Sequence, residues 1–346
     1  MPVATSTATG MVPPPFEEIA VDDWVFWILT CGFCVYFVIL LLEFNRPSQK
    51  LMEHFVNQEA RRQDMSHRHS HAKEQTEEMK VLLEGMEQEM SILEEKRKEI
   101  LPEANKRLMV HIPSGSYTMG SHDEDSPRNQ RPAHTVSLSG YFISKTPVTN
   151  QEYREFVLCT GHREPIHWLR GTFPTGMGKH PVVNVSFQDA SDYAAWRSVR
   201  LPSESEWEKA AKGTDERPYP WGTRYTEGER CNANSQIGTT TPVDEWPDGL
   251  SFYDVWDMAG NVYEWCQDYL DEEYYKESPS TNPKGPDGGQ ERVLRGGSYQ
   301  ETRAALRTTH RMGSSEVLTK DYVGFRLAMD AEDTPSGSEE KGRDDV

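Results

Sequence analysis

The chain has 346 residues, with 37 Lys and Arg against 56 Asp and Glu, which gives a formal net charge of −19. This acidic balance excludes a general nucleic-acid binder, because that function requires a positive surface. Hydrophobic residues make up 36% of the chain, below the usual share of about 45–50%. Part of the chain is therefore expected to lie outside a hydrophobic core.

An acidic N-terminal tail, residues 1–23, precedes an apolar segment at residues 24–42 that contains no charge. Such a segment is long enough to cross a bilayer as one helix, and Trp24 and Trp27 lie where interfacial aromatic residues belong. The alternatives are a buried core helix or a signal peptide, but no Lys or Arg precedes the segment as a signal peptide requires. We expect a single-pass transmembrane helix over residues 24–43 that anchors the chain in a lipid bilayer.

The residues on either side of this segment carry opposite charges. Acidic side chains precede it and basic side chains follow it: Glu17, Glu18, Asp22 and Asp23 on one side, and Arg46, Lys50, Arg61 and Arg62 on the other. The positive-inside rule then places the C-terminal side in the cytoplasm.

Residues 48–107 are polar and contain no proline before Pro102. Apolar side chains recur there in alternating steps of four and three residues, at Met79, Leu83, Met86, Met90, Leu93 and Ile100. Arg97 occupies the one position of this pattern that is not apolar. This spacing predicts a helix with a heptad seam of about three repeats. Two interpretations remain open, a solvated helical stalk and a coiled coil that forms a homo-oligomer.

The composition changes at residue 110, and residues 110–330 predict an α+β domain with much irregular backbone. The residues at 110–121 suggest a short hairpin, and those at 134–144 a strand. Three helices are expected next. The first two begin with capping pairs, Thr149 with Glu152 and Ser186 with Asp189, and the third lies within residues 202–213. The acidic tail, residues 331–346, is expected to be disordered.

The chain from about residue 110 to 330 resembles the formylglycine-generating enzyme (sulfatase-modifying factor) family. The matching segments occur in order and include PSGSYTMGS, TPVTNQEYREFV, HPVVNVSFQDASDYAAW, RLPSESEWEKAA, DMAGNVYEW, VLRGGSY and VGFRLA. The resemblance implies an elaborated C-type lectin fold. It does not extend to the predicted anchor or stalk.

The enzymes of this family oxidise a substrate cysteine to formylglycine with copper and oxygen, using two cysteines that follow the GGS motif. In this chain Glu301 and Leu306 stand at the two positions. A copper(I) site needs soft sulfur ligands, so we expect no copper and no catalytic residue of that kind. Cys159, Cys231 and Cys266 lie in other motifs, and their spacing does not bring them to this site.

The resemblance also implies structural calcium. One site would use side-chain oxygens of Asp257 and Glu264 with the carbonyls of Gly260 and Val262; the alternative is a hydrogen-bonded turn without an ion. A second, shortened loop would keep only Asn234 and the Ser235 carbonyl. Four arginines are expected to pair with carboxylates near the centre of the fold: Arg295, Arg307, Arg311 and Arg326.

These features lead to the hypothesis of a membrane-anchored pseudoenzyme that acts as a binding or scaffolding module, accessory to other subunits of a membrane complex. The alternative is an oxidoreductase of the same family with a different metal site, such as iron held by Glu301 and His310, a pair whose spacing offers no support. The flanking charge favours a cytoplasmic domain, whereas calcium loops suit a periplasmic or extracellular one.

Overall fold

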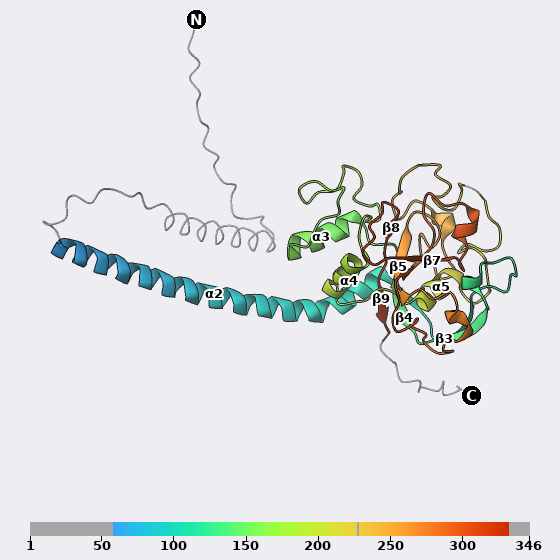
Figure 1. Cartoon of the computed structure of the whole chain (residues 1–346), viewed down its shortest axis with the longest axis horizontal. Helices are drawn as coiled ribbons and strands as arrows, with labels where there is room; N and C mark the ends of the chain where they lie inside the picture. Colours follow the sequence, from blue (N-terminus) through green and yellow to red (C-terminus); the bar gives the residue numbers. More distant parts are fainter. Residues whose placement is uncertain (1–57, 227, 332–346) are drawn as a thin grey trace, which may run out of the picture. The chain divides into compact units, whose positions relative to one another are not determined.

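The computed structural model describes residues 58–226 and 228–331 (Figure 1). The described residues fall into two units, divided after Met86. The predicted transmembrane segment, the N-terminal tail and residues 332–346 lie outside the described ranges. Within those ranges, no helix combines the length and the hydropathy needed to cross a membrane.

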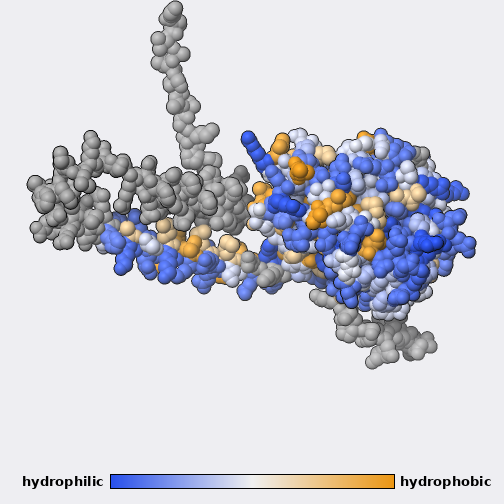
Figure 2. Space-filling model, in the orientation of Figure 1, coloured by the Kyte–Doolittle hydropathy of each residue, from blue (hydrophilic) through white to orange (hydrophobic). Residues whose placement is uncertain are grey.

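Helix α2 spans Gln58–Leu108 and contains Pro102. The predicted seam lies on this helix, and the side chains of Met79, Leu83, Met90 and Leu93 are 46–56% exposed. Figure 2 shows apolar residues among hydrophilic ones along α2. The helical part of the prediction agrees with this structure, and self-association through the seam stays a prediction.

The last turns of α2 pack against the folded unit rather than extending as free stalk. The Arg97 guanidinium lies 4.4 Å from the centre of the Trp196 ring and donates to the Trp196 carbonyl at 2.7 Å. Asn105 is buried, donates to the Arg197 carbonyl and accepts from the Arg197 guanidinium. Arg97 therefore interrupts the seam because its side chain binds the end of a neighbouring helix.

Three small sheets organise the folded unit. One has the order β1-β4-β9, with β1 at Met109–Ile112, β4 at Tyr141–Ser144 and β9 at Ala328–Asp330. The second pairs β2 at Gly115–Met119 with β3 at His134–Leu138. The third has the order β7-β6-β5-β8, with β7 at Arg311–Ser314, β6 at Arg292–Arg295, β5 at Tyr263–Tyr269 and β8 at Val323–Gly324.

The predicted hairpin within residues 110–121 is wrong. Instead β1 pairs with β4 and β2 pairs with β3, so the segment at 109–119 lies antiparallel to the segment at 134–144. Strand structure is interrupted in both segments at facing positions, residues 113–114 and residues 139–140. The antiparallel pairing of the two segments is therefore split between two sheets. This arrangement buries Ile112, Tyr117 and Val136 in a common core.

The three predicted helices are present as α3 at Asn150–Thr160, α4 at Phe187–Trp196 and α5 at Glu204–Lys212. Each begins with a complete capping box, at Thr149, Ser186 and Ser203, which satisfies backbone N–H groups that the helix leaves unpaired. Figure 1 shows α3 and α4 at one side of the folded unit and β5, β7 and β8 at its centre. Short 3-10 helices complete the described elements: η1 Arg128–Gln130, η2 Pro247–Gly249, η3 Tyr274–Lys276 and η4 Arg303–Leu306.

Fully buried ion pairs cross-link these elements. Arg295 pairs with Glu208, Arg311 with Glu204, and Arg326 with Glu264. The prediction of central arginine–carboxylate pairs is confirmed for these three arginines. Arg307 instead pairs with the partly exposed Asp123 at 3.2 Å. Because buried charges are costly unless paired, these contacts restrict how α5 can pack on the third sheet.

Candidate functional site

The segment after β6 turns sharply at Gly296 and Gly297, whose φ angles are 95° and 73°. A Cβ atom on Gly297 would lie 2.7 Å from the Ala305 carbonyl oxygen, so the turn requires glycine. The chain then runs through Glu301 into η4. This turn is what brings residues 301 and 306 close to β5 and to the loop at residues 231–236.

Leu306 occupies an apolar site. It is 1% exposed and packs in a cluster with Tyr219, Cys231, Ala233 and Ala259. Burial raises the pKa of the Cys231 thiol to about 12, so this sulfur stays protonated at neutral pH. Cys266 lies in another core cluster and Cys159 is exposed. Within the described residues, two thiols do not converge at this position.

Glu301 faces a different environment, centred on the Tyr263 side chain. The Tyr263 hydroxyl lies 3.3 Å from His310 Nε2, and the Glu301 side chain is near enough that, besides burial, its charge raises the pKa of the Tyr263 phenol. The structure thus brings Glu301 and His310 near the same phenol, although their spacing in the sequence did not suggest it. Sequence reasoning missed Tyr263, which directly precedes Glu264 in the GNVYEW motif.

Burial controls the protonation of the Tyr263 phenol and the His310 imidazole. It raises the pKa of the Tyr263 phenol, with a further contribution from the Glu301 charge. Burial also lowers the pKa of His310 to about 4, assisted by the Arg295 charge. At neutral pH the site therefore holds a protonated phenol and a neutral imidazole beside the Glu301 side chain, a set suited to hydrogen bonding with a polar ligand. The described residues contain no cluster of three or more His, Cys, Asp or Glu that could hold a metal ion.

The predicted calcium loop at residues 257–264 has an inward-turned backbone. Asp257, Gly260 and Asn261 all have φ between 54° and 78°. The Asp257 carboxylate is buried and accepts from Asn261 Nδ2 at 3.0 Å. Burial raises the pKa of Asp257 to about 7, because removal from water disfavours the charged carboxylate.

Glu264 has stronger partners. It accepts from Trp207 Nε1 at 2.6 Å and from Arg326 through both carboxylate oxygens. Three of the roughly four lone-pair positions of the carboxylate are thus used. Oε1 accepts only from Arg326 Nη2, at 2.7 Å, which leaves one of its lone-pair positions without a partner among the described residues. Glu264 is thus already paired with Arg326, and calcium binding at this loop stays a prediction.

The shorter loop places its two predicted ligands at the surface. Asn234 and Ser235 are exposed and have positive φ angles of 57° and 53°. Their backbone N–H groups donate to the carbonyls of Glu301 and Tyr299 at 2.8 and 2.7 Å. These two residues thus hold the segment that carries Glu301, and calcium binding at them stays a prediction.

Comparison with known proteins identifies relatives with different activities. A formylglycine-generating enzyme of Streptomyces coelicolor is 35% identical over 67% of this chain and 92% of its own length. The serine/threonine-protein kinase Pkn1 of Chlamydia trachomatis is 37% identical over 69% of this chain. The match covers only 41% of that kinase. An inactive C-alpha-formylglycine-generating enzyme 2 of Mus musculus is 30% identical over 67% of this chain and 88% of its own length.

Solved structures show the same fold. PvdO from Pseudomonas aeruginosa superimposes with a TM-score of 0.55 at 27% identity, covering 64% of this chain and 94% of PvdO. The Treponema denticola variable protein 1 gives a TM-score of 0.54 at 28% identity, covering 64% of this chain and 95% of that protein. The sulfatase-modifying factor enzyme 1-like domain family matches residues 96–331, a range that includes the last turns of α2. The chain therefore belongs to the family of sulfatase-modifying factor enzyme 1-like domains.

Proposed function

We propose that this chain is a membrane-anchored, non-catalytic binding or scaffolding protein, an accessory to other subunits of a membrane complex. The observation that carries the proposal is the chemistry at the two positions after the GGS motif. Glu301 supplies a hard oxygen and Leu306 a buried aliphatic group, whereas copper(I) chemistry needs thiolate sulfur. The nearby Cys231 does not replace them, because its raised pKa keeps it a thiol.

The test is an aerobic assay of the full-length protein with copper and a cysteine-containing peptide. We expect no conversion of cysteine to formylglycine by mass spectrometry, with the Streptomyces coelicolor enzyme as the positive control. Conversion above the level seen without protein would contradict the proposal.

A second experiment tests whether only the two sulfur ligands for copper(I) are missing or whether the rest of the copper site is missing as well. The Glu301→Cys/Leu306→Cys double variant restores sulfur at both positions on an otherwise unchanged turn. We expect the double variant to bind copper(I) and the wild-type protein to bind none, measured by competition with a chromogenic copper(I) chelator. Cys231 is the control: a Cys231→Ala change should leave the result in both proteins unaltered.

We propose structural calcium at the loop that contains Asp257 and Glu264. An ion there would neutralise the buried Asp257 carboxylate and hold the loop to the third sheet, without contact to a substrate. Calcium should then raise the melting temperature of the wild-type protein but not of Asp257→Asn, with magnesium as the control ion. An equal rise in both proteins would rule out this loop as the site. Calcium at Asn234 and Ser235 is a separate proposal, tested by Asn234→Ala in the same assay.

The proposal also includes the transmembrane anchor, the side of the membrane on which the domain lies, and a homo-oligomer formed through α2. Residues 24–43 cross the membrane, the flanking charges favour a cytoplasmic domain, and the exposed seam of α2 pairs with a second copy. Protease access in intact and permeabilised cells distinguishes a cytoplasmic domain from a periplasmic or extracellular one. For the seam, Leu83→Asp should lower the mass measured by sedimentation, whereas Glu84→Gln on the same helix should not.

One observation favours an alternative, an oxidoreductase that uses a different metal. His310 contacts the Tyr263 hydroxyl and Glu301 lies near the same phenol, so an oxygen and a nitrogen ligand are on the same side of the site. Metal analysis of the protein purified without chelators distinguishes the two functions. About one iron per chain that is lost in His310→Ala favours the oxidoreductase, whereas calcium without iron or copper favours the scaffold.

A further inference from the structure

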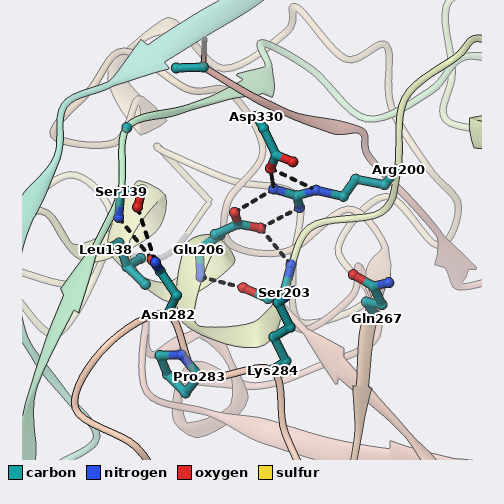
Figure 3. A pocket seen from close by; sticks show the side chains of 12 residues that line it. Leu138, Ser139, Arg200, Ser203, Glu206, Gln267, Asn282, Pro283, Lys284 and Asp330 are labelled. Atoms are coloured by element: carbon teal, nitrogen blue, oxygen red, sulfur yellow. Dashed lines mark hydrogen bonds and ion pairs between the residues drawn. The ribbon is translucent and has the colours of Figure 1, made fainter. Parts of the chain in front are cut away.

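A cavity of about 410 Å³ lies away from the segment that carries Glu301. It is formed where β9 ends, where α5 begins, and where the β3–β4 connection meets the loop at residues 282–284. This volume falls in the range of about 300–1,000 Å³ that small-molecule sites occupy. Figure 3 shows its polar lining, with Arg200 between two carboxylates.

The Arg200 guanidinium contacts two carboxylates, one mostly buried and one exposed, and also donates to the Leu201 carbonyl at 3.2 Å. Glu206, whose side chain is 12% exposed, accepts from Nη1 and Nη2 at 2.7 Å each. On the other edge, Nε donates to Asp330 Oδ1 at 3.1 Å, and Nη2 contacts the same oxygen. The Asp330 side chain is 82% exposed, so little holds it in place beyond this contact. An exposed ion pair of this kind contributes only about 0.2–1 kcal/mol.

A second cation and a rigid wall complete the cavity. Lys284 lines it and is exposed, and within the described residues its ammonium makes no ion pair. Asn282 fixes the opposite wall, because its side chain accepts from Ser139 N at 2.9 Å and donates to Ser139 Oγ at 3.0 Å. The exposed Gln267 amide also lines the cavity and can donate a hydrogen bond.

We propose that this cavity binds the oxyanion group of a small carboxylate or phosphate ligand, which displaces Asp330 from the outer edge of Arg200 and is also bound by Lys284. Glu206 keeps the guanidinium oriented, so the Nε–Nη2 edge presents two parallel donors that match an oxyanion. The Asp330 carboxylate then competes with the bound oxyanion for the Nε–Nη2 edge of Arg200. The site does not depend on the membrane anchor or on the residues at positions 301 and 306.

The experiment titrates the full-length protein, in mild detergent, with citrate and with inorganic phosphate by isothermal titration calorimetry. Chloride at matched ionic strength is the control for general screening. The variants are Lys284→Gln and Asp330→Asn, both exposed and outside the core. Lys179→Gln and Asp244→Asn change the charge equally at a surface ion pair that does not line the cavity.

We expect one site per chain for at least one of the two anions. Lys284→Gln should weaken binding about two- to fivefold and Asp330→Asn should strengthen it by a similar factor, the range that one exposed ion pair supplies. The two control variants should bind as the wild-type protein does. Citrate and phosphate report whether a carboxylate or a phosphate fits better. Absence of binding by both anions, or binding that neither cavity variant alters, would overturn the proposal.

Discussion

Removing the charge of Glu208 should destabilise the folded unit more than any surface charge change. The Glu208 side chain is fully buried on α5, and its carboxylate accepts from Gly120 N at 2.8 Å, from Lys212 Nζ at 3.1 Å and from Arg295 Nη2. Glu208→Gln keeps the shape of the side chain but leaves two buried cations with less compensation. Glu204 Oε1, 3.4 Å from Arg295, is then the nearest remaining carboxylate to that cation.

The expected loss follows from the cost of breaking a buried ion pair on one side, about 3–5 kcal/mol. That is a large part of the roughly 5–15 kcal/mol that stabilises a typical domain. Urea unfolding followed by tryptophan fluorescence measures the difference as a shift of the midpoint. The control is Glu273→Gln, which removes an exposed pair with Lys276 and should cost at most about 1 kcal/mol. A loss in Glu208→Gln no larger than in this control would refute the reasoning.

The pH dependence gives a second check on the same variant. Burial acts to raise the pKa of Glu208, but the charges of Lys212 and Arg295 outweigh it and lower the pKa below its usual value. A carboxyl group with a lowered pKa in the folded state contributes stability above the ordinary glutamate pKa of about 4.3 and loses it at lower pH. The difference between the wild-type protein and Glu208→Gln should therefore be constant at neutral pH and shrink only in acid.

Two further predictions concern the site and the helices. His310 should remain neutral from pH 5 to pH 8, because burial lowers its pKa to about 4; a ring proton signal that titrates near the ordinary value of about 6.5 in NMR spectra would contradict the neutral imidazole beside Tyr263. Thr149→Ala removes the side chain that caps α3 and should cost about 1 kcal/mol in urea unfolding, whereas Thr149→Ser should restore most of that stability.

Local features of the chain were predictable because their physical causes lie within a few residues. The capping boxes at Thr149 and Ser186 involve partners only three positions apart, so the sequence alone indicated where α3 and α4 begin. The ordered motifs likewise indicated the family, and the expectation that Glu301 and Leu306 stand at the cysteine positions rests on the same motifs. The heptad spacing indicated the helix of α2 for the same reason.

Contacts between distant segments were decided only by the tertiary structure. The strand at residues 115–119 pairs with β3 rather than folding back on β1, because the choice of partner depends on a core shared with α5 and β6. Glu301 and His310 meet at Tyr263 only because the turn at Gly297 and the pairing of β5 with β6 bring these segments together. Arg200 and Asp330 are separated by 130 residues. Spacing along the chain carries no information about such pairs, since packing of the whole unit determines their distance.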